Sequence, residues 1–305
     1  MEINFNSTKA ILIAGATATG KSALGLRLAQ RYNGVIINAD ALQVYADWHI
    51  LTARPSAQEQ ASCPHRLYGH VPLNTPYSTG AWIKDLRLQL KHAQAEGLRP
   101  IILGGTGLYF KTLTQGIAEI PDISTEVKAQ ADDLEATLGK GIFAQLLAQA
   151  DPASLAGLDA QNPMRTRRAW EVLTSTGRGI SSWQADTPPP LLDIAQTTPV
   201  VLNSEVEWLN ARINRRFDMM VEMGALDECR AILESGKWNP NHPSNKAIGA
   251  AEIISHLQGD LSLEAAIDSA KVQTRQYAKR QRTWFRSQMK NWHQLAIDKP
   301  LEFPL

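Results

Sequence analysis

The chain of 305 residues has few of the features that mark secreted, membrane or metal-cluster proteins. Its only cysteines, Cys63 and Cys229, are far apart, which argues against a disulfide framework or zinc cluster and favours a reducing compartment. No stretch approaches the roughly 18 apolar residues of a membrane span, and the N-terminus lacks the pattern of a signal peptide. The net charge is only +1, so any basic site for nucleic acid must be local. We therefore expect a cytoplasmic protein that does not contact membranes.

The sequence does contain the pattern of an α/β protein. Apolar residues make up 44% of the chain and charged residues 20%, which excludes a disordered chain. Short apolar runs at residues 10–14, 35–37, 100–103 and 200–202 are typical of buried parallel strands. Helical patterns at residues 21–31 and about 80–96 alternate with the first three runs. This alternation predicts a doubly wound parallel sheet.

The pattern changes between the third and fourth predicted strands. Residues 116–199 have helical periodicity without a strand run and end in a proline-rich segment, whereas long helical patterns fill most of residues 204–292. We predict an α/β core domain formed by residues 1–115 and 200–305. It has a P-loop-type parallel sheet flanked by helices and a helical C-terminal part, and residues 116–199 form a helical insertion domain.

The first predicted strand runs into a phosphate-loop motif. Residues 15–22 read GATATGKS, which is G-x-x-x-x-G-K-S between a strand and an amphipathic helix. Gly15 and Gly20 permit a tight loop whose backbone N–H groups point at anionic oxygens. Lys21 adds a positive charge, and the Ser22 hydroxyl suits a metal ion. The motif predicts a diphosphate site without deciding whether the diphosphate belongs to a nucleotide.

Two more turns are expected at the same edge of the sheet. Asp40 follows the second strand, and its carboxylate suits a magnesium ligand, a general base or a helix cap. The Gln43 amide both donates and accepts, which suits recognition of a polar ring edge. After the third strand, Thr106 in GGTG (residues 104–107) either donates to the diphosphate or belongs to a plain glycine turn.

Two groups of cations stand out. The first lies at helical spacing without any acidic residue between its ends, which indicates either contact with a polyphosphate such as RNA or a solvated helix face. A second group near the end of the insertion leaves the same alternatives open. The first comprises Lys271, Arg275, Lys279, Arg282, Arg286 and Lys290, and the second comprises Arg165, Arg167 and Arg168.

These segments together resemble the tRNA dimethylallyltransferases, which modify adenosine next to the anticodon. The resemblance covers nearly the whole chain. Its most specific segments are NADALQVY (residues 38–45), PIILGGTGLYFKTL (100–113) and TRQYAKRQRTWFR (274–286). It also rests on GATATGKS (15–22), TARPS (52–56), PHRL (64–67), YSTGAW (77–82), RTRRAWEVLTSTGRGIS (165–181) and AIGAAE (247–252).

The resemblance implies transfer of a dimethylallyl group from dimethylallyl diphosphate to N6 of adenosine 37, with release of pyrophosphate. It implies that Asp40 is the base, that Lys21 and Thr106 stabilise the leaving group, and that Ser22 binds Mg²⁺. A monomer that binds the tRNA anticodon stem-loop is expected. The implied diphosphate ligands are Gly15, Thr17, Ala18, Thr19, Gly20, Lys21 and Ser22, and the implied tRNA contacts are Asp40, Ala41, Leu42, Gln43, Met164, Arg165, Arg167, Arg168, Arg275, Lys279 and Arg282.

The chain departs from the usual family pattern at several positions. Ala41 replaces a serine, Leu51 a glycine, Arg54 a lysine, Met164 a glutamine and Ala250 a tyrosine. These departures leave open a second function, that of an RNA-binding protein whose catalytic site has decayed. A third function, that of a P-loop nucleotide or small-molecule kinase, also stays open, because such kinases share the phosphate loop and the aspartate.

Overall fold

A computed structural model describes residues 3–6 and 9–298 and divides the chain into two compact units. The first unit comprises residues 1–114 and 191–305, and the second comprises residues 115–190. Residues 191–199, which we predicted as part of the insertion, thus fall in the first unit. The reason is that Leu191, Leu192 and Ile194 pack against the core of that unit.

A six-stranded parallel sheet with the order β3-β2-β4-β1-β5-β6 forms the centre of the first unit. Its four central strands are the four predicted ones, and they are buried because both faces of a parallel sheet are covered by other elements. The two edge strands are short and were not predicted. The strands are β1 (Ala10–Gly15), β2 (Gly34–Asn38), β3 (His65–Arg66), β4 (Arg99–Gly104), β5 (Thr197–Asn203) and β6 (His293–Ala296).

Helices cover both faces of this sheet. On one face, α1 (Lys21–Arg31) packs through Leu24 and Leu28. On the other, α3 (Thr79–Ala95) and α4 (Gly107–Gln115) pack together, and the Trp82 and Tyr109 rings stack with centroids 4.2 Å apart. The short helix α2 (Ala57–Ser62) precedes β3. The predicted doubly wound α/β fold is confirmed.

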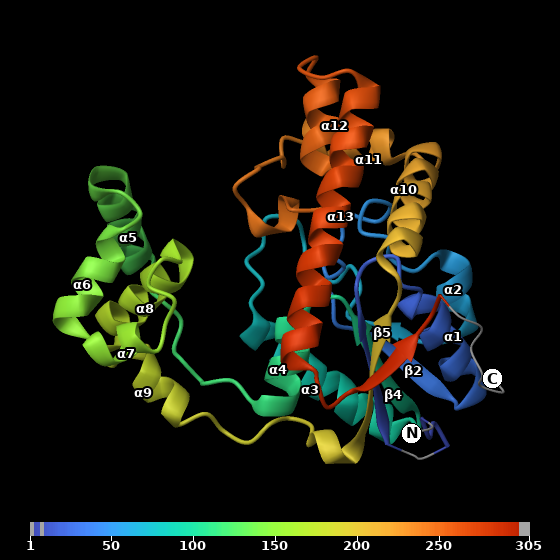
Figure 1. The fold of residues 1–305 in the computed structure, drawn as a ribbon, viewed down its shortest axis with the longest axis horizontal. Coiled ribbons are helices and arrows are strands. Elements are labelled where there is room, and N and C mark those ends of the chain that lie inside the picture. The colour runs from blue at the N-terminus through green and yellow to red at the C-terminus, as the bar shows by residue number, and fades with distance from the viewer. Residues whose placement is uncertain (1–2, 7–8, 299–305) are drawn as a thin grey trace. The chain divides into compact units, whose positions relative to one another are not determined.

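A helical layer lies beyond the carboxyl ends of the strands (Figure 1). It consists of α10 (Val206–Glu222), α11 (Ala225–Glu234), α12 (Ala250–Leu257) and α13 (Leu263–Gln288). A separate apolar cluster that includes Trp48, Phe217 and Ile253 joins this layer to the loop after β2. The 26-residue α13 has no glycine or proline, and the Ser262 side chain caps its first turn. The layer therefore places α13 next to the turns at the strand ends.

The second unit consists of helices in the structure. These are α5 (Thr125–Leu138), α6 (Ile142–Ala150), α7 (Pro152–Ala156), α8 (Pro163–Thr176) and α9 (Ile180–Ala185). Leu147, Ala169 and Val172 are completely buried in its small core. Across the described residues of both units, every helix is too short or too polar to cross a lipid bilayer.

Candidate functional site

The phosphate loop leaves the start of α1 open to an anion. The backbone of Ala18 (φ 62°) and Gly20 (φ 85°) is left-handed, and the Thr19 hydroxyl donates to the Ala16 carbonyl over 2.7 Å to hold the turn. Gly20 is the N-cap of α1 and supplies no side-chain hydrogen bond. The first amides of α1 thus combine with the positive end of the helix dipole, as a phosphate site requires.

Lys21 lies over this loop and donates to the Ala16 carbonyl at 2.8 Å. Burial lowers the pKa of its ammonium group to about 8, while the charge of Asp40 opposes this shift and that of Arg216 adds to it. Lys21 therefore lies near both an anion and a second cation. A diphosphate would offer its ammonium group a better partner than the loop carbonyl.

Asp40 is held by its own turn and caps no helix. Its Oδ1 accepts from the Leu42 amide at 3.0 Å, and its own amide donates to Asn38 Oδ1 at 2.8 Å. Asn38 also donates to the Asp40 carbonyl at 2.9 Å, so the turn is braced on both sides. The first helix after this turn is α2, so the helix-cap alternative for Asp40 is wrong. The other Asp40 oxygen lies 3.2 Å from where a Cβ on Gly105 would stand.

Thr106 joins the Asp40 turn to the glycine turn after β4. Its hydroxyl accepts from the Ala41 amide at 2.9 Å, and its own amide donates to the Ala39 carbonyl at 3.2 Å. The hydroxyl proton of Thr106 is left for another acceptor. Because β2, β4 and β1 are neighbours in the sheet, the three predicted turns meet at one edge.

The Gln43 amide nitrogen is already used inside the protein. It donates to the carbonyls of Thr52 (2.8 Å) and Ala53 (3.0 Å), which leaves the amide oxygen for a ligand. The loop that carries these carbonyls is fixed by Glu228 of α11. The Glu228 carboxylate accepts from the backbone amides of residues 49, 50 and 51 at 2.6, 2.8 and 3.0 Å.

Three residues near the loop were missed in the sequence. Gln281 of α13 is hydrogen-bonded to the phosphate loop and to the glycine turn. Arg212 of α10 donates to the Ala18 carbonyl at 3.0 Å, and Arg216 lies one helical turn later. Burial lowers the pKa of Arg216, against the attraction of Asp40. The four-residue spacing of the two arginines was the available signal, since it places both on one helix face.

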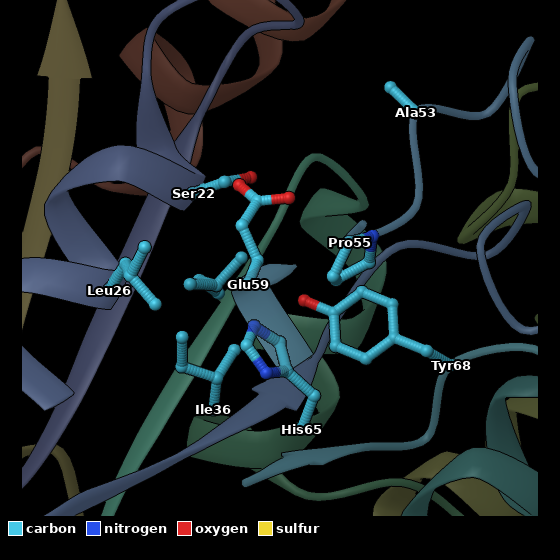
Figure 2. A pocket seen from close by; sticks show the side chains of 9 residues that line it. Ser22, Leu26, Ile36, Ala53, Pro55, Glu59, His65 and Tyr68 are labelled. Carbon is cyan, nitrogen blue, oxygen red and sulfur yellow. The ribbon is translucent and has the colours of Figure 1, made fainter. Parts of the chain in front are cut away.

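A pocket opens beside Ser22 on the α1 side of the loop. Ser22, Glu59, His65 and Tyr68 line it with polar groups, while Leu26, Ile36 and Leu103 supply apolar walls. The side-chain oxygens of Ser22 and Glu59 point toward one another in Figure 2. The His65 Nδ1 lies 2.9 Å from the Cys63 carbonyl, which can only accept, so Nδ1 carries the proton. Burial lowers the pKa of His65, which favours a neutral ring with an acceptor at Nε2.

Two of the cations of α13 have partners on a neighbouring helix. Lys271 pairs with Asp218 of α10 at 2.5 Å, and Arg275 donates to Asn214 of the same helix at 2.6 Å. Because both partners lie on α10, the spacing of residues along α13 alone could not reveal them. Lys279 is exposed, and the buried Nε of Arg282 has no partner among the described residues. Arg286 and Lys290 are also exposed.

The arginine cluster in the second unit divides into two kinds. The Arg167 guanidinium is bound by three carboxylates, those of Asp132 (2.7 Å), Glu135 (3.0 Å) and Glu171 (2.9 Å). These partners raise its pKa. Arg167 therefore links α5 to α8 in this structure, and its expected contact with RNA stays a prediction. Met164, Arg165 and Arg168 are exposed near the start of α8, with Met164 75% exposed.

The other departures from the family pattern are absorbed by packing. Ala41 packs against the main core cluster, and Leu51 and Ala250 are buried in the apolar cluster that joins the helical layer to the loop after β2. Arg54 donates to the Tyr45 carbonyl at 3.2 Å, and its guanidinium lies against Gly69, where a Cβ would overlap it. These substitutions therefore leave the three turns intact.

Comparison with known proteins identifies the family to which the sequence is similar. The family model described as IPP transferase matches residues 43–288, and the one described as isopentenyl transferase matches residues 8–71. A tRNA dimethylallyltransferase from Cereibacter sphaeroides (strain ATCC 17029 / ATH 2.4.9) is 52% identical over 291 residues, which cover 95% of this chain and 90% of the relative. One from Dinoroseobacter shibae is 53% identical over 285 residues, 92% of this chain and 93% of the relative.

Solved structures agree with these relatives. The full-length tRNA isopentenylpyrophosphate transferase from Bacillus halodurans aligns with a TM-score of 0.68 and 30% identity, covering 97% of this chain and 92% of that one. A eukaryotic dimethylallyltransferase, captured acting on tRNA, aligns with a TM-score of 0.83 and 29% identity, covering 97% and 75%. The comparisons support the transferase function and not the kinase alternative.

Proposed function

The chain belongs to the IPP transferase family, and we propose that it prenylates tRNA. The proposed reaction joins C1 of dimethylallyl diphosphate to N6 of adenosine 37, next to the anticodon. The N6 lone pair forms the new C–N bond, the bond between C1 and the diphosphate oxygen breaks, and one N6 proton leaves. Pyrophosphate is the second product.

One observation supports this proposal above the others. The second carboxylate oxygen of Asp40 faces the same glycine turn that Gln281 ties to the phosphate loop. A base and a diphosphate cradle thus lie at one edge of the sheet, on three neighbouring strands. An amine seated between them is in reach of both an allylic carbon and a proton acceptor.

The residues of the site divide the work by charge. The leaving diphosphate gains negative charge as the C–O bond breaks, and Lys21, the open amides of the loop and the Thr106 hydroxyl stabilise that charge. Arg212 and Arg216 add positive charge near the same loop. Asp40 takes the proton from the N6 amine, which is a weak nucleophile because its lone pair is conjugated with the purine. Exclusion of water then protects the donor from hydrolysis.

The residues around Ser22 fit a hydrated magnesium ion. The Ser22 hydroxyl has no partner among the described residues, and the pocket beside it also holds the Glu59 carboxylate and the His65 acceptor. Magnesium prefers oxygen ligands and keeps several of its waters, for which Glu59 and His65 are suitable acceptors. When bound, the ion would neutralise charge on the diphosphate.

For the RNA, we propose contacts from both units. Lys279, Arg282, Arg286 and Lys290 of α13 suit phosphates of the anticodon stem-loop, as do Arg165 and Arg168 in the second unit. The exposed side chain of Met164 near them is uncharged and suits contact with a base. Arg275 is held by Asn214 and contributes less. The target adenine leaves its stack to enter the site, where the Gln43 amide oxygen accepts from its edge. We propose that the protein acts as a monomer.

The experiment that tests this function uses an unmodified anticodon stem-loop and labelled dimethylallyl diphosphate. Wild-type protein with Mg²⁺ should place the label on N6 of one adenosine. Asp40→Asn should lower kcat by a factor on the order of 10² to 10⁴ while the affinity for the stem-loop stays within about twofold, because the carboxylate acts on the proton. Equal rates for both proteins, or phosphoryl transfer from ATP, would overturn the proposal.

A further inference from the structure

Gln281 uses both ends of its side chain to join two loops that are distant in the sequence. Its Oε1 accepts from the Thr17 amide of the phosphate loop at 2.8 Å, and its Nε2 donates to the Gly105 carbonyl of the glycine turn at 2.9 Å. Gln281 as a whole is only 6% exposed. A buried amide with a partner at each end is held in one orientation, because any rotation would leave polar groups unsatisfied.

The glycine turn is shaped to receive α13. A Cβ on Gly105 would overlap the Gln281 amide nitrogen, and a Cβ on Gly107 would overlap the ring of Trp284. Gln281 and Trp284 are three residues apart and so lie on the same helix face. None of these contacts involves a left-handed backbone at residues 105 or 107. The two glycines are therefore needed because the helix comes so close.

The Thr17 amide, which we expected to bind the diphosphate, is already occupied by Gln281. The Thr19 amide likewise turns back to the Ala16 carbonyl at 3.3 Å. The amides that remain toward an anion are those nearest the start of α1. Their distance from the Thr106 hydroxyl depends on how the phosphate loop sits relative to the glycine turn, and Gln281 is hydrogen-bonded to both.

We propose that Gln281 is a positioning residue that sets the spacing between the phosphate loop and the Gly105 turn, so that both grip one diphosphate. It does not touch the reacting atoms. It acts through the Thr17 amide and the Gly105 carbonyl, and α13 serves as the rigid support. This inference rests on the proposed binding of dimethylallyl diphosphate at the phosphate loop.

The first test replaces Gln281 by methionine, which has a similar length and no amide. The dissociation constant for dimethylallyl diphosphate with Mg²⁺, measured by calorimetry, should rise about tenfold or more, since two hydrogen bonds that set the cradle are lost. The affinity for the anticodon stem-loop should change less than about twofold. The matched control is Gln276→Met on the exposed side of the same helix, which should leave both affinities unchanged.

A double-mutant cycle supplies the second test and does not depend on one variant. Gly105→Ala alone should weaken diphosphate binding, because its Cβ would overlap the Gln281 amide. In the Gln281→Ala background that overlap is absent, so the same substitution should cost much less. Equal losses in the two backgrounds would contradict the proposal, because residues in direct contact are expected to be coupled.

The outcomes separate this inference from the proposed function. If wild-type protein fails to bind dimethylallyl diphosphate, the proposed function fails. If wild type binds and Gln281→Met binds equally well, only the role of Gln281 is refuted. A parallel loss of diphosphate and stem-loop affinity in Gln281→Met would also refute it, because it would mean a general loss of structure.

Discussion

Glu228 offers a quantitative test of how the substrate loop is held. Its carboxylate accepts from three successive backbone amides, those of His49, Ile50 and Leu51. The next two carbonyls along the loop hold the side chain of Gln43. A single side chain of α11 therefore positions the residue that we propose to read the adenine.

Glu228→Gln changes this contact without changing its size. The new amide oxygen can still accept from His49 and Ile50, but the amide nitrogen would face the Leu51 N–H, so two donors would oppose each other. One unsatisfied amide costs about 1–3 kcal/mol, and the two remaining hydrogen bonds lose the charge of their acceptor. Because the site is only partly buried, we expect a net loss of about 2 kcal/mol in the local opening free energy.

Hydrogen exchange measures this quantity directly. A loss of about 2 kcal/mol corresponds to roughly thirtyfold faster exchange of the amides at 49–51. The control is Glu234→Gln on the same helix, which is exposed and should change nothing. In turnover assays, Glu228→Gln should raise KM for the RNA and leave the affinity for the donor unchanged. Unchanged exchange at 49–51 would refute the argument.

Three further predictions concern charge. The pKa of Lys21 is lowered to about 8, so its charge should not affect the pH dependence of dimethylallyl diphosphate affinity below pH 8. Above pH 8 the affinity should fall by up to about tenfold per pH unit, as Lys21 loses its proton. The fall should vanish in Lys21→Arg, and a fall that persists in this variant would show that another group causes it. Glu59→Gln keeps the capping box of α2. By calorimetry, this variant should bind Mg²⁺ more weakly in its complex with the donor, while its affinity for the diphosphate without Mg²⁺ should be unchanged. Equal Mg²⁺ affinities of the variant and the wild type would contradict a role for the carboxylate. Arg167→Met should lower the free energy of unfolding by on the order of 1 kcal/mol without changing the salt dependence of RNA binding. Arg168→Met should reduce the salt dependence of RNA binding without changing the free energy of unfolding. Identical effects of the two variants would contradict the different roles given to Arg167 and Arg168.

The sequence predicted the elements whose signals are local. The strands at 10–15 and 99–104 contain the short apolar runs at 10–14 and 100–103, and the phosphate loop has its own spacing rule. The edge strand β3 has only two residues, and β6 has four, with alternating rather than continuous burial. Such short edge strands form because a sheet is already present, so their own residues carry little signal.

Only those residues of the site that belong to local motifs could be predicted from the sequence. Lys21, Asp40 and Thr106 were placed by motifs that lie directly after strands. Gln281 acts on a loop 264 residues away, and Glu228 on one 179 residues away, so no local pattern marks either of them. The role of Arg167 was hidden because two of its three partners lie on α5, and only packing in space brings them together.

In the glycine turn after β4, neighbouring groups and not the backbone angles of the turn require glycine. Gly104 is closed off by the backbone of Ala39, Gly105 by the amide of Gln281 and Gly107 by the indole of Trp284. Three unrelated neighbours each forbid a methyl group at a different position. A methyl group added at any of these glycines would thus first meet a different part of the protein. An engineer could make room at Gly105 or Gly107 by shortening Gln281 or Trp284, whereas the backbone of Ala39 at Gly104 offers no such option.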